Sequence, residues 1–404
     1  MRPARRGLLA SVTALIVGLP TAAHADHAWS AGLSGPPAAS AGTAAASAGE
    51  TAAGVVTASA STASVSRAAT PKPSPSGGKS PWGPWPAAKP GVARVVKERW
   101  LGQRMVDIHI SSPSVNAVLP VRLLLPEGWS KGARRTWPVL YLLHGGADDY
   151  TSWTRMTNIA ATTENMDAII VMPEAGRAGN YSDWYNHGRR GAPAWETFHT
   201  YELRRLLEIG YRAGSRRAVA GLSMGAYGAM KYAARHPGMF RFAGSYSGIM
   251  STRLPGIPEL IMNAQAAEGQ DPKALWGDPI RNHRVWKAND PAYLARNLRG
   301  MKLYISSGTT SRLGELDPPG APWSPAHLSE PISAYTAKDL VAKLRRYGVK
   351  PMVHLYKDGT HSWPYWKREF DRSFPMILSA LGLEEDARDE DDSPPLGLWT
   401  HPFG

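Results

Sequence analysis

Short hydrophobic runs recur along the chain between residues 106 and 356. Residues 139–143 and 168–173 are unbroken apolar runs, which are typical of strands covered on both faces. Residues 106–110 alternate between apolar and polar, which indicates a strand with one buried face. The same reading predicts eight strands in all, at 106–110, 118–125, 139–143, 168–173, 217–222, 242–246, 301–305 and 352–356.

Amphipathic helical patterns separate many of these strands. They are clearest at residues 194–209, 226–235, 332–347 and 363–381. Alternating strands and helices with continuous apolar strands predict an α/β fold, with a doubly wound, mostly parallel sheet covered by helices on both faces. We therefore expect one folded domain over residues 94–383.

The two ends of the chain differ from this domain. Residues 1–25 read as a signal peptide, because arginines precede an apolar stretch and Ala-His-Ala at 23–25 is typical of a cleavage site. Residues 26–93 are rich in Ala, Ser, Gly and Pro, which predicts a disordered linker. Residues 384–404 read as an acidic flexible tail. We expect export, by either the general or the twin-arginine route, to the cell envelope or the medium.

Composition narrows the chemistry. The chain has no cysteine, which excludes disulfides, thiolate metal sites and cysteine nucleophiles. Its net charge of +13 is spread along the sequence, without the basic and aromatic runs of nucleic-acid binders. We expect no nucleic-acid partner, no metal and no cofactor, and a basic surface suited to peripheral contact with an anionic envelope.

One pentapeptide carries the strongest chemical signal. Gly-Leu-Ser-Met-Gly at 221–225 ends an apolar run and precedes a helical pattern, as in the nucleophile elbow of α/β hydrolases. The glycines allow a sharp strand-to-helix turn that leaves no room for β-carbons. Ser223 is the predicted nucleophile, at the start of a helix whose free N–H groups favour negative charge.

A serine nucleophile needs a base and an acid, which in this fold follow it in the order acid, then histidine. His361 lies in the loop after the last predicted strand, where the base belongs. The acid is expected in the loop after the preceding strand, where two carboxylates compete. Asp317 is favoured because it precedes two prolines that stiffen the backbone, and Glu315 is the alternative.

A tetrahedral oxyanion also needs two backbone N–H donors. One is expected at Met224, directly after the nucleophile. The other is expected at Gly146, because His-Gly-Gly at 144–146 lets the backbone approach a ligand closely.

Several segments resemble the antigen 85 mycolyltransferases and the broader esterase D-like family of α/β hydrolases. They are GLSM at 221–224, DDYTSW at 148–153, YSDWY at 181–185, WETF at 195–198 and HSWPYW at 361–366. The resemblance runs in order from about residue 94 to 383. It implies a secreted acyl-transfer enzyme with an acyl-serine intermediate, whose acyl group passes from an ester to a sugar hydroxyl, a glycerolipid or water.

The sequence also departs from that family. The loop after the third strand is shorter and lacks a sugar-contacting arginine, and the family's catalytic glutamate falls at Arg312 in an ungapped comparison. These departures favour a general esterase or acyltransferase acting on an ester lipid or a small acyl ester. The alternatives are a mycolyltransferase or diacylglycerol acyltransferase proper, and a non-catalytic envelope- or matrix-binding protein.

Five residues are candidates for substrate contact, and each has an alternative structural role. The aromatic ones line an acyl or sugar groove or else pack in the core. The aspartate contacts an alcohol acceptor or else caps a turn. The candidates are Trp153, Asp183, Trp184, Ser362 and Trp363.

Overall fold

The computed structural model describes residues 92–189, 191 and 193–384. The predicted signal peptide, residues 26–91 of the predicted linker and the tail beyond residue 384 lie outside the described residues. The secondary structure runs from β1, which begins at Arg94, to α10, which ends at Leu381.

Nine strands form a single sheet in the order β1-β2-β3-β5-β4-β6-β7-β8-β9. The predicted α/β fold is confirmed, and each of the eight predicted strands is present within a few residues of its expected bounds. The strands are β1 (Arg94–Trp100), β2 (Met105–Ser112), β3 (Ala117–Leu124), β4 (Trp137–Leu143), β5 (Ile169–Pro173), β6 (Ala213–Leu222), β7 (Phe242–Tyr246), β8 (Lys302–Gly308) and β9 (Met352–Tyr356).

The sheet has an antiparallel part and a parallel part. Strands β1, β2, β3 and β5 pair antiparallel, whereas β5, β4, β6, β7, β8 and β9 pair parallel. Strand β1 was not predicted, because it is a largely exposed edge strand whose polar residues give no clear alternation. The carboxyl ends of the parallel strands meet at one edge, where ligands bind in open α/β sheets.

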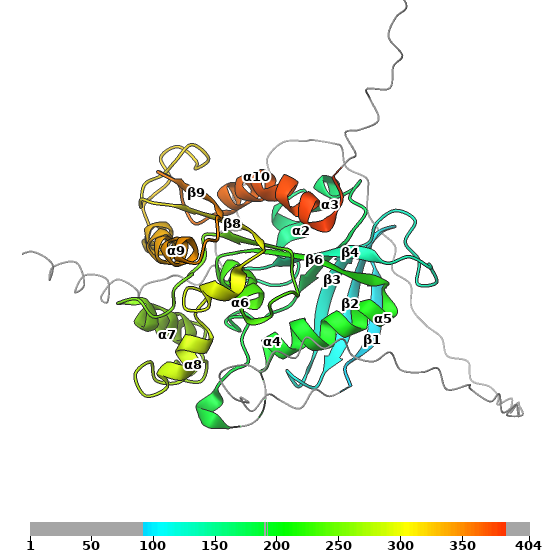
Figure 1. Cartoon of the computed structure of the whole chain (residues 1–404), viewed down its shortest axis with the longest axis horizontal. Helices are drawn as coiled ribbons and strands as arrows, with labels where there is room; N and C mark the ends of the chain where they lie inside the picture. The colour runs from blue at the N-terminus through cyan, green and yellow to red at the C-terminus, as the bar shows by residue number, and fades with distance from the viewer. Residues whose placement is uncertain (1–91, 190, 192, 385–404) are drawn as a thin grey trace, which may run out of the picture. The chain divides into compact units, whose positions relative to one another are not determined.

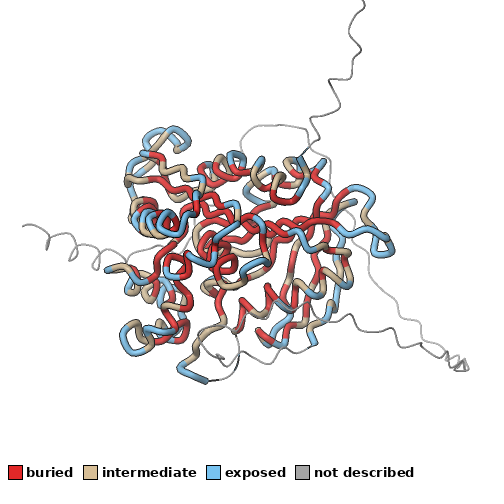
Figure 2. Tube along the Cα trace, viewed as in Figure 1, coloured by how far each residue is buried: buried red, intermediate tan, exposed pale blue. Residues whose placement is uncertain are grey.

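Successive residues of the central strands enter two separate hydrophobic cores. Val139, Tyr141 and Leu143 of β4 belong to one core. Leu140 and Leu142 belong to the other. Every residue of β4 is buried, so the strand reads as a continuous apolar run (Figure 2).

The helices cover both faces of the sheet (Figure 1). One core receives side chains from α4, the π-helical segment η3, α5, α6, α7, α8 and α9, and the other receives them from α2, α3 and α10. No helix among the described residues is long and apolar enough to cross a membrane. The bounds are α2 (Ser152–Met156), α3 (Ile159–Thr162), η2 (Asn186–Gly188), α4 (Trp195–Thr197), η3 (Phe198–Leu203), α5 (Arg204–Gly210), α6 (Met224–Arg235), α7 (Ile257–Ala267), α8 (His283–Ala288), η4 (Ala295–Leu298), η5 (Pro325–Leu328), α9 (Ser329–Arg346) and α10 (Trp363–Leu381).

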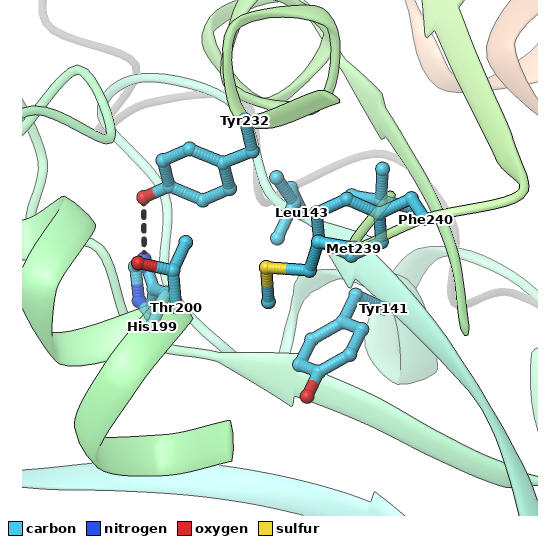
Figure 3. A pocket seen from close by; sticks show the side chains of 8 residues that line it. Tyr141, Leu143, His199, Thr200, Tyr232, Met239 and Phe240 are labelled. Carbon is cyan, nitrogen blue, oxygen red and sulfur yellow. Dashed lines mark hydrogen bonds between the residues drawn. The ribbon is translucent and has the colours of Figure 1, made fainter. Parts of the chain in front are cut away.

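A small cavity lies between the π-helical segment and the sheet (Figure 3). Its volume of about 10 Å³ has room for at most one water molecule. His199 lines it and forms a 2.8 Å hydrogen bond through Nδ1 with the Tyr232 hydroxyl, and its Nε2 lies 2.8 Å from the Glu174 carbonyl. Burial lowers the pKa of His199 to about 3, so this imidazole is a neutral packing element.

A buried ionic network joins α4 to α6, the helix that follows the predicted nucleophile. The Glu196 carboxylate lies 2.9 Å from Lys231 Nζ, 2.7 Å from Arg235 Nε and 2.7 Å from His236 Nε2. Burial alone would raise the pKa of Glu196, but the positive charges of Arg235 and Lys231 hold it well below its usual value. Burial also lowers the pKa of Lys231 to about 8.

We expect Glu196→Gln to destabilise the fold by about 3–5 kcal/mol, because it leaves buried cations without their counter-charge. Urea unfolding measures this loss. The control is Asp371→Asn, which breaks the exposed 2.7 Å pair between Lys367 and Asp371 and should cost less than about 1 kcal/mol. Equal losses in the two variants would contradict a stabilising role for the buried network.

Candidate active site

Ser223 occupies a sharp turn between β6 and α6. Its φ of 51° and ψ of −117° are strained for a non-glycine residue. The turn is held by a 2.9 Å hydrogen bond from the Ser223 N–H to the Tyr246 carbonyl. A β-carbon at Gly225 would lie 2.3 Å from the Leu143 carbonyl oxygen, so a larger residue there would force the backbone to shift. The predicted strand-to-helix elbow is present.

His361 lies in the loop after β9, within hydrogen-bond distance of this serine. Its Nε2 is 2.8 Å from Ser223 Oγ, so the contact expected between these two residues is present. The Trp366 ring meets the imidazole edge to face, with 4.9 Å between ring centroids. The Trp366 ring packs against one side of the imidazole and limits the rotation of the imidazole ring.

Glu330 holds the other side of the imidazole. Its Oε1 lies 2.7 Å from His361 Nδ1, and its side chain is fully buried. Because Nδ1 faces a carboxylate, we assign the proton to Nδ1, which leaves Nε2 free to accept the proton of the Ser223 hydroxyl. The second oxygen, Oε2, accepts hydrogen bonds from the backbone N–H of Gly308 and from the hydroxyls of Ser247, Ser307 and Tyr356.

The expected acid was therefore wrong. Asp317 has no contact with His361, because its carboxylate accepts hydrogen bonds from the Gly314 N–H, the Tyr365 hydroxyl and the Thr360 hydroxyl instead. The alternative, Glu315, has a side chain that is 74% exposed and pairs with Arg368.

The physical reason is the course of the chain after β8. The loop does not present the acid itself but continues through η5 to the first turn of α9, where Glu330 points back to the site. The sequence pattern placed the helix start at residue 332, so Glu330 lay outside it. Proline is common in the first turn of a helix, so Pro331 could have indicated that the helix begins at Ser329. That start would have placed Glu330 in the first turn of the helix.

The two residues expected to donate to an oxyanion lie beside the serine. A β-carbon at Gly145 would lie 3.6 Å from Ser223 Cβ, and one at Gly146 would lie 3.9 Å from Met224 Cβ. Within the described residues, neither the Gly146 nor the Met224 N–H donates to another protein group. Met224 is also the first residue of α6, where the helix dipole favours negative charge.

His144 holds this loop in place, a role that the sequence did not reveal. Its Nδ1 lies 2.7 Å from the Gly145 carbonyl, and its Nε2 accepts a 3.0 Å hydrogen bond from the Ala175 N–H. The Tyr181 hydroxyl donates to the His144 carbonyl at 2.8 Å. Because a trans peptide directs its C=O and N–H oppositely, fixing the Gly145 carbonyl also fixes the direction of the Gly146 N–H.

Two of the residues expected to contact substrate have structural roles instead. Trp153 is 1% exposed and packs in the core against Trp363, which excludes it from a substrate groove. Asp183 accepts hydrogen bonds from the Thr197 N–H and hydroxyl at 2.9 and 2.6 Å, which is the turn-capping alternative. Burial, with help from Glu196, raises the pKa of this carboxyl.

The remaining candidates lie at partly exposed positions. Trp184 lines an open cavity of about 290 Å³ together with Arg177 and Glu268. This cavity borders the oxyanion loop, residues 144–147, which carries the predicted oxyanion donor Gly146, because the Arg177 carbonyl accepts a 2.9 Å hydrogen bond from the Ala147 N–H. Trp363 packs on Trp366 at the start of α10. Ser362 immediately precedes that helix, and its hydroxyl lies 3.0 Å from that of Thr360.

The described residues contain no group of three or more His, Asp or Glu side chains placed to hold a metal ion. The arrangement can instead support nucleophilic chemistry. A serine hydroxyl, an imidazole and a buried carboxylate lie in a hydrogen-bonded line, with free N–H groups beside the serine. This geometry suits acyl transfer through a tetrahedral intermediate.

The sequence matches the putative esterase family over residues 112–377. The chain belongs to this family. This putative esterase is 33% identical to the diacylglycerol acyltransferase/mycolyltransferase Ag85B of Mycobacterium leprae, over 60% of its own length and 76% of the relative's. It is 31% identical to Ag85A of Mycobacterium tuberculosis, over 68% and 81% of the two chains.

Solved structures show the same fold. The crystal structure of Mycobacterium tuberculosis MPT51 (FbpC1) aligns with a TM-score of 0.59 at 23% identity, over 69% of this chain and all of that one. The predicted resemblance to the antigen 85 and esterase D-like proteins is confirmed. Relatives of this putative esterase are esterases and acyltransferases, so ester hydrolysis or acyl transfer is the activity of its family.

The elbow glycine gives a prediction for this site. We expect Gly225→Ala to lower the melting temperature by more than 5 °C or to prevent folding, because its β-carbon would lie 2.3 Å from a carbonyl oxygen of β4. The control is Gly102→Ala, where a β-carbon meets nothing within 4 Å. Differential scanning calorimetry compares the two, and an unchanged melting temperature for Gly225→Ala would contradict the described elbow.

Proposed function

We propose that this putative esterase is an exported serine esterase or acyltransferase that works through an acyl-Ser223 intermediate. The observation that carries the proposal is the line of two hydrogen bonds, 2.8 Å from Ser223 to His361 and 2.7 Å from His361 to Glu330. A serine hydroxyl is a weak nucleophile until a base removes its proton, and an imidazole fixed by a carboxylate is such a base.

The first half of the reaction acylates the serine. His361 Nε2 takes the proton of the Ser223 hydroxyl as Oγ attacks the ester carbonyl carbon. The N–H groups of Gly146 and Met224 stabilise the negative oxygen that forms. The tetrahedral intermediate then collapses, the bond from carbon to the leaving alkoxy oxygen breaks, and His361 gives its proton to that oxygen.

The second half releases the acyl group by the same steps in reverse. His361 deprotonates water or an alcohol, which attacks the acyl carbon, and Ser223 Oγ leaves and regains a proton. Glu330 stays ionised throughout and stabilises the imidazolium. Water as the acceptor gives an esterase, and a sugar or glycerolipid hydroxyl gives an acyltransferase.

The substrate is an ester lipid or a small acyl ester. The cavity lined by Trp184 suits the alcohol portion, since it borders the oxyanion loop and combines an aromatic ring with the Arg177–Glu268 pair. A volume of about 290 Å³ fits one small group and not a long acyl chain. Trp363 and Ser362 lie next to His361, where they suit contact with the ester itself.

A non-catalytic envelope- or matrix-binding role is disfavoured by the same geometry. A strained residue costs about 1–3 kcal/mol and persists where the surrounding structure enforces it. Ser223 is held in such a conformation, and its hydroxyl points at an imidazole that a buried carboxylate fixes. A surface used only for binding has no need of this combination.

Removing the nucleophile tests the proposal. We expect Ser223→Ala to reduce kcat/KM on short p-nitrophenyl esters by at least about 10³-fold, because no other hydroxyl replaces Oγ. The matched control is Ser215→Ala, an exposed serine of the same strand, which should leave the rate unchanged. Equal rates for Ser223→Ala and the wild type would refute the catalytic assignment.

The acid is tested separately. We expect Glu330→Gln to lower kcat by about 10³–10⁴-fold, because an amide can donate to Nδ1 and favours the wrong imidazole tautomer. Steady-state hydrolysis measures the change, with the exposed Glu315→Gln as control. A large loss in Glu315→Gln with none in Glu330→Gln would return the acid to the loop after β8.

Acceptor choice needs a separate experiment. Wild-type protein is given an activated ester with and without a sugar or diacylglycerol, and the products are analysed by mass spectrometry. A transferase forms the acylated acceptor, whereas an esterase gives only the free acid. An unchanged product spectrum and rate would count against transfer to these acceptors.

A further inference from the structure

The loop after β8 runs alongside the loop that carries His361. Hydrogen bonds join the two loops at several successive positions. The N–H groups of Thr309 and Thr310 both donate to the Lys357 carbonyl at 3.1 Å, the Thr310 hydroxyl donates to Asp358 at 2.6 Å, and the Gly359 N–H donates to the Arg312 carbonyl at 2.9 Å. The segment that reaches Asp317 is thus fastened to the histidine loop along its length.

Asp317 forms the last of these attachments. Its Oδ1 accepts the hydroxyl proton of Thr360, the residue directly before His361. Its Oδ2 accepts from the Tyr365 hydroxyl at 2.9 Å and from the Gly314 N–H at 2.8 Å. Thr360 is 8% exposed, so its hydroxyl has little access to replacement hydrogen bonds from bulk water.

These contacts anchor the chain on both sides of the histidine. Thr360 precedes His361, and Tyr365 lies in the first turn of α10, four residues after it. Because Thr360 gives its only proton to Asp317, the Ser362 hydroxyl 3.0 Å away must donate to Thr360 Oγ1. The hydroxyls that flank the imidazole therefore form one chain that ends on Asp317.

The backbone just before Thr360 has a conformation that other contacts must hold in place. Gly359 has a φ of 149°, which side-chain-bearing residues rarely adopt, and a β-carbon there would lie 2.5 Å from the Tyr365 ring. Glycine has wide conformational freedom, so the position of the following residues depends on their own contacts. Among the described residues of this loop, Glu330 forms a hydrogen bond with the imidazole ring of His361 and with no backbone group.

We propose that Asp317 is a positioning residue for His361 and acts through the Thr360 hydroxyl. This inference rests on the proposed function. Glu330 sets the tautomer and orientation of the ring, whereas Asp317 sets the place of the loop from which the ring extends. Small displacements of a catalytic group are costly, since about 1 Å can reduce a rate about 100-fold.

The first test removes the carboxylate. We expect Asp317→Ala to lower kcat on a p-nitrophenyl ester by about 10–100-fold with KM within about twofold, because the base is displaced and the ester site is not. Glu315→Ala, two residues away and exposed, is the matched control and should keep the wild-type kcat. A folded Asp317→Ala variant with wild-type kcat would overturn the proposal.

The second test follows the route through Thr360 and holds even if Asp317→Ala unfolds. Thr360→Val keeps the shape but loses the hydroxyl, and its kcat should fall about as far as that of Asp317→Ala. Thr360→Ser keeps the hydroxyl and should restore most of the rate. In the double variant Asp317→Ala/Thr360→Val the two losses should not multiply. Equal rates for the Val and Ser variants would overturn the route.

A third readout needs no turnover and so separates this inference from the proposed function. The Nδ1 proton shared by His361 and Glu330 should give a far-downfield proton NMR signal, assigned by its absence in Glu330→Gln. We expect Asp317→Ala to shift or broaden this signal. An unchanged signal would contradict the anchor, whereas hydrolysis that is independent of Ser223 would contradict the proposed function alone.

Discussion

The proposed chemistry of this protein depends on one hydrogen bond, 2.8 Å long, between residues that are 138 positions apart in the sequence. Ser223 is fixed by a strained turn whose glycines admit no β-carbon. His361 extends from a loop at the carboxyl end of β9. The bond can form because the parallel sheet brings these two loops to the same edge, so the fold as a whole places the imidazole within hydrogen-bond distance of the serine.

Three carboxylates near this edge of the sheet have different roles because their surroundings differ. Glu330 is fully buried, touches the imidazole and is held by four donors on its second oxygen. Asp317 meets hydroxyls and an N–H, and fastens the loop. Glu315 is exposed and pairs with Arg368. Their order in the chain says little about these roles, since each follows from its contacts.

Much of the fold could be predicted, because the buried parallel strands are continuous apolar runs and the elbow has a local signature. The contact expected between Ser223 and His361 is present, because one lies at the elbow and the other in the loop after the last strand. Gly146 and Met224 remain the predicted oxyanion donors. The carboxylate that contacts His361 could not be predicted, because Glu330 lies at a helix start beyond a long loop, and no local sequence pattern shows which carboxylate points toward the site. For Trp153 the sequence left groove lining and core packing both open, because the two have the same sequence signal, and the structure places it in the core.

We expect Ser223 to carry the acyl group during turnover. The most direct test is rapid acid quenching of the enzyme during hydrolysis of a slow ester, followed by peptide mass spectrometry. We expect an acyl mass on the peptide that contains Ser223 in the wild type, and none in the His361→Ala variant. Steady hydrolysis with no acylated peptide, or with the acyl group on another residue, would contradict it.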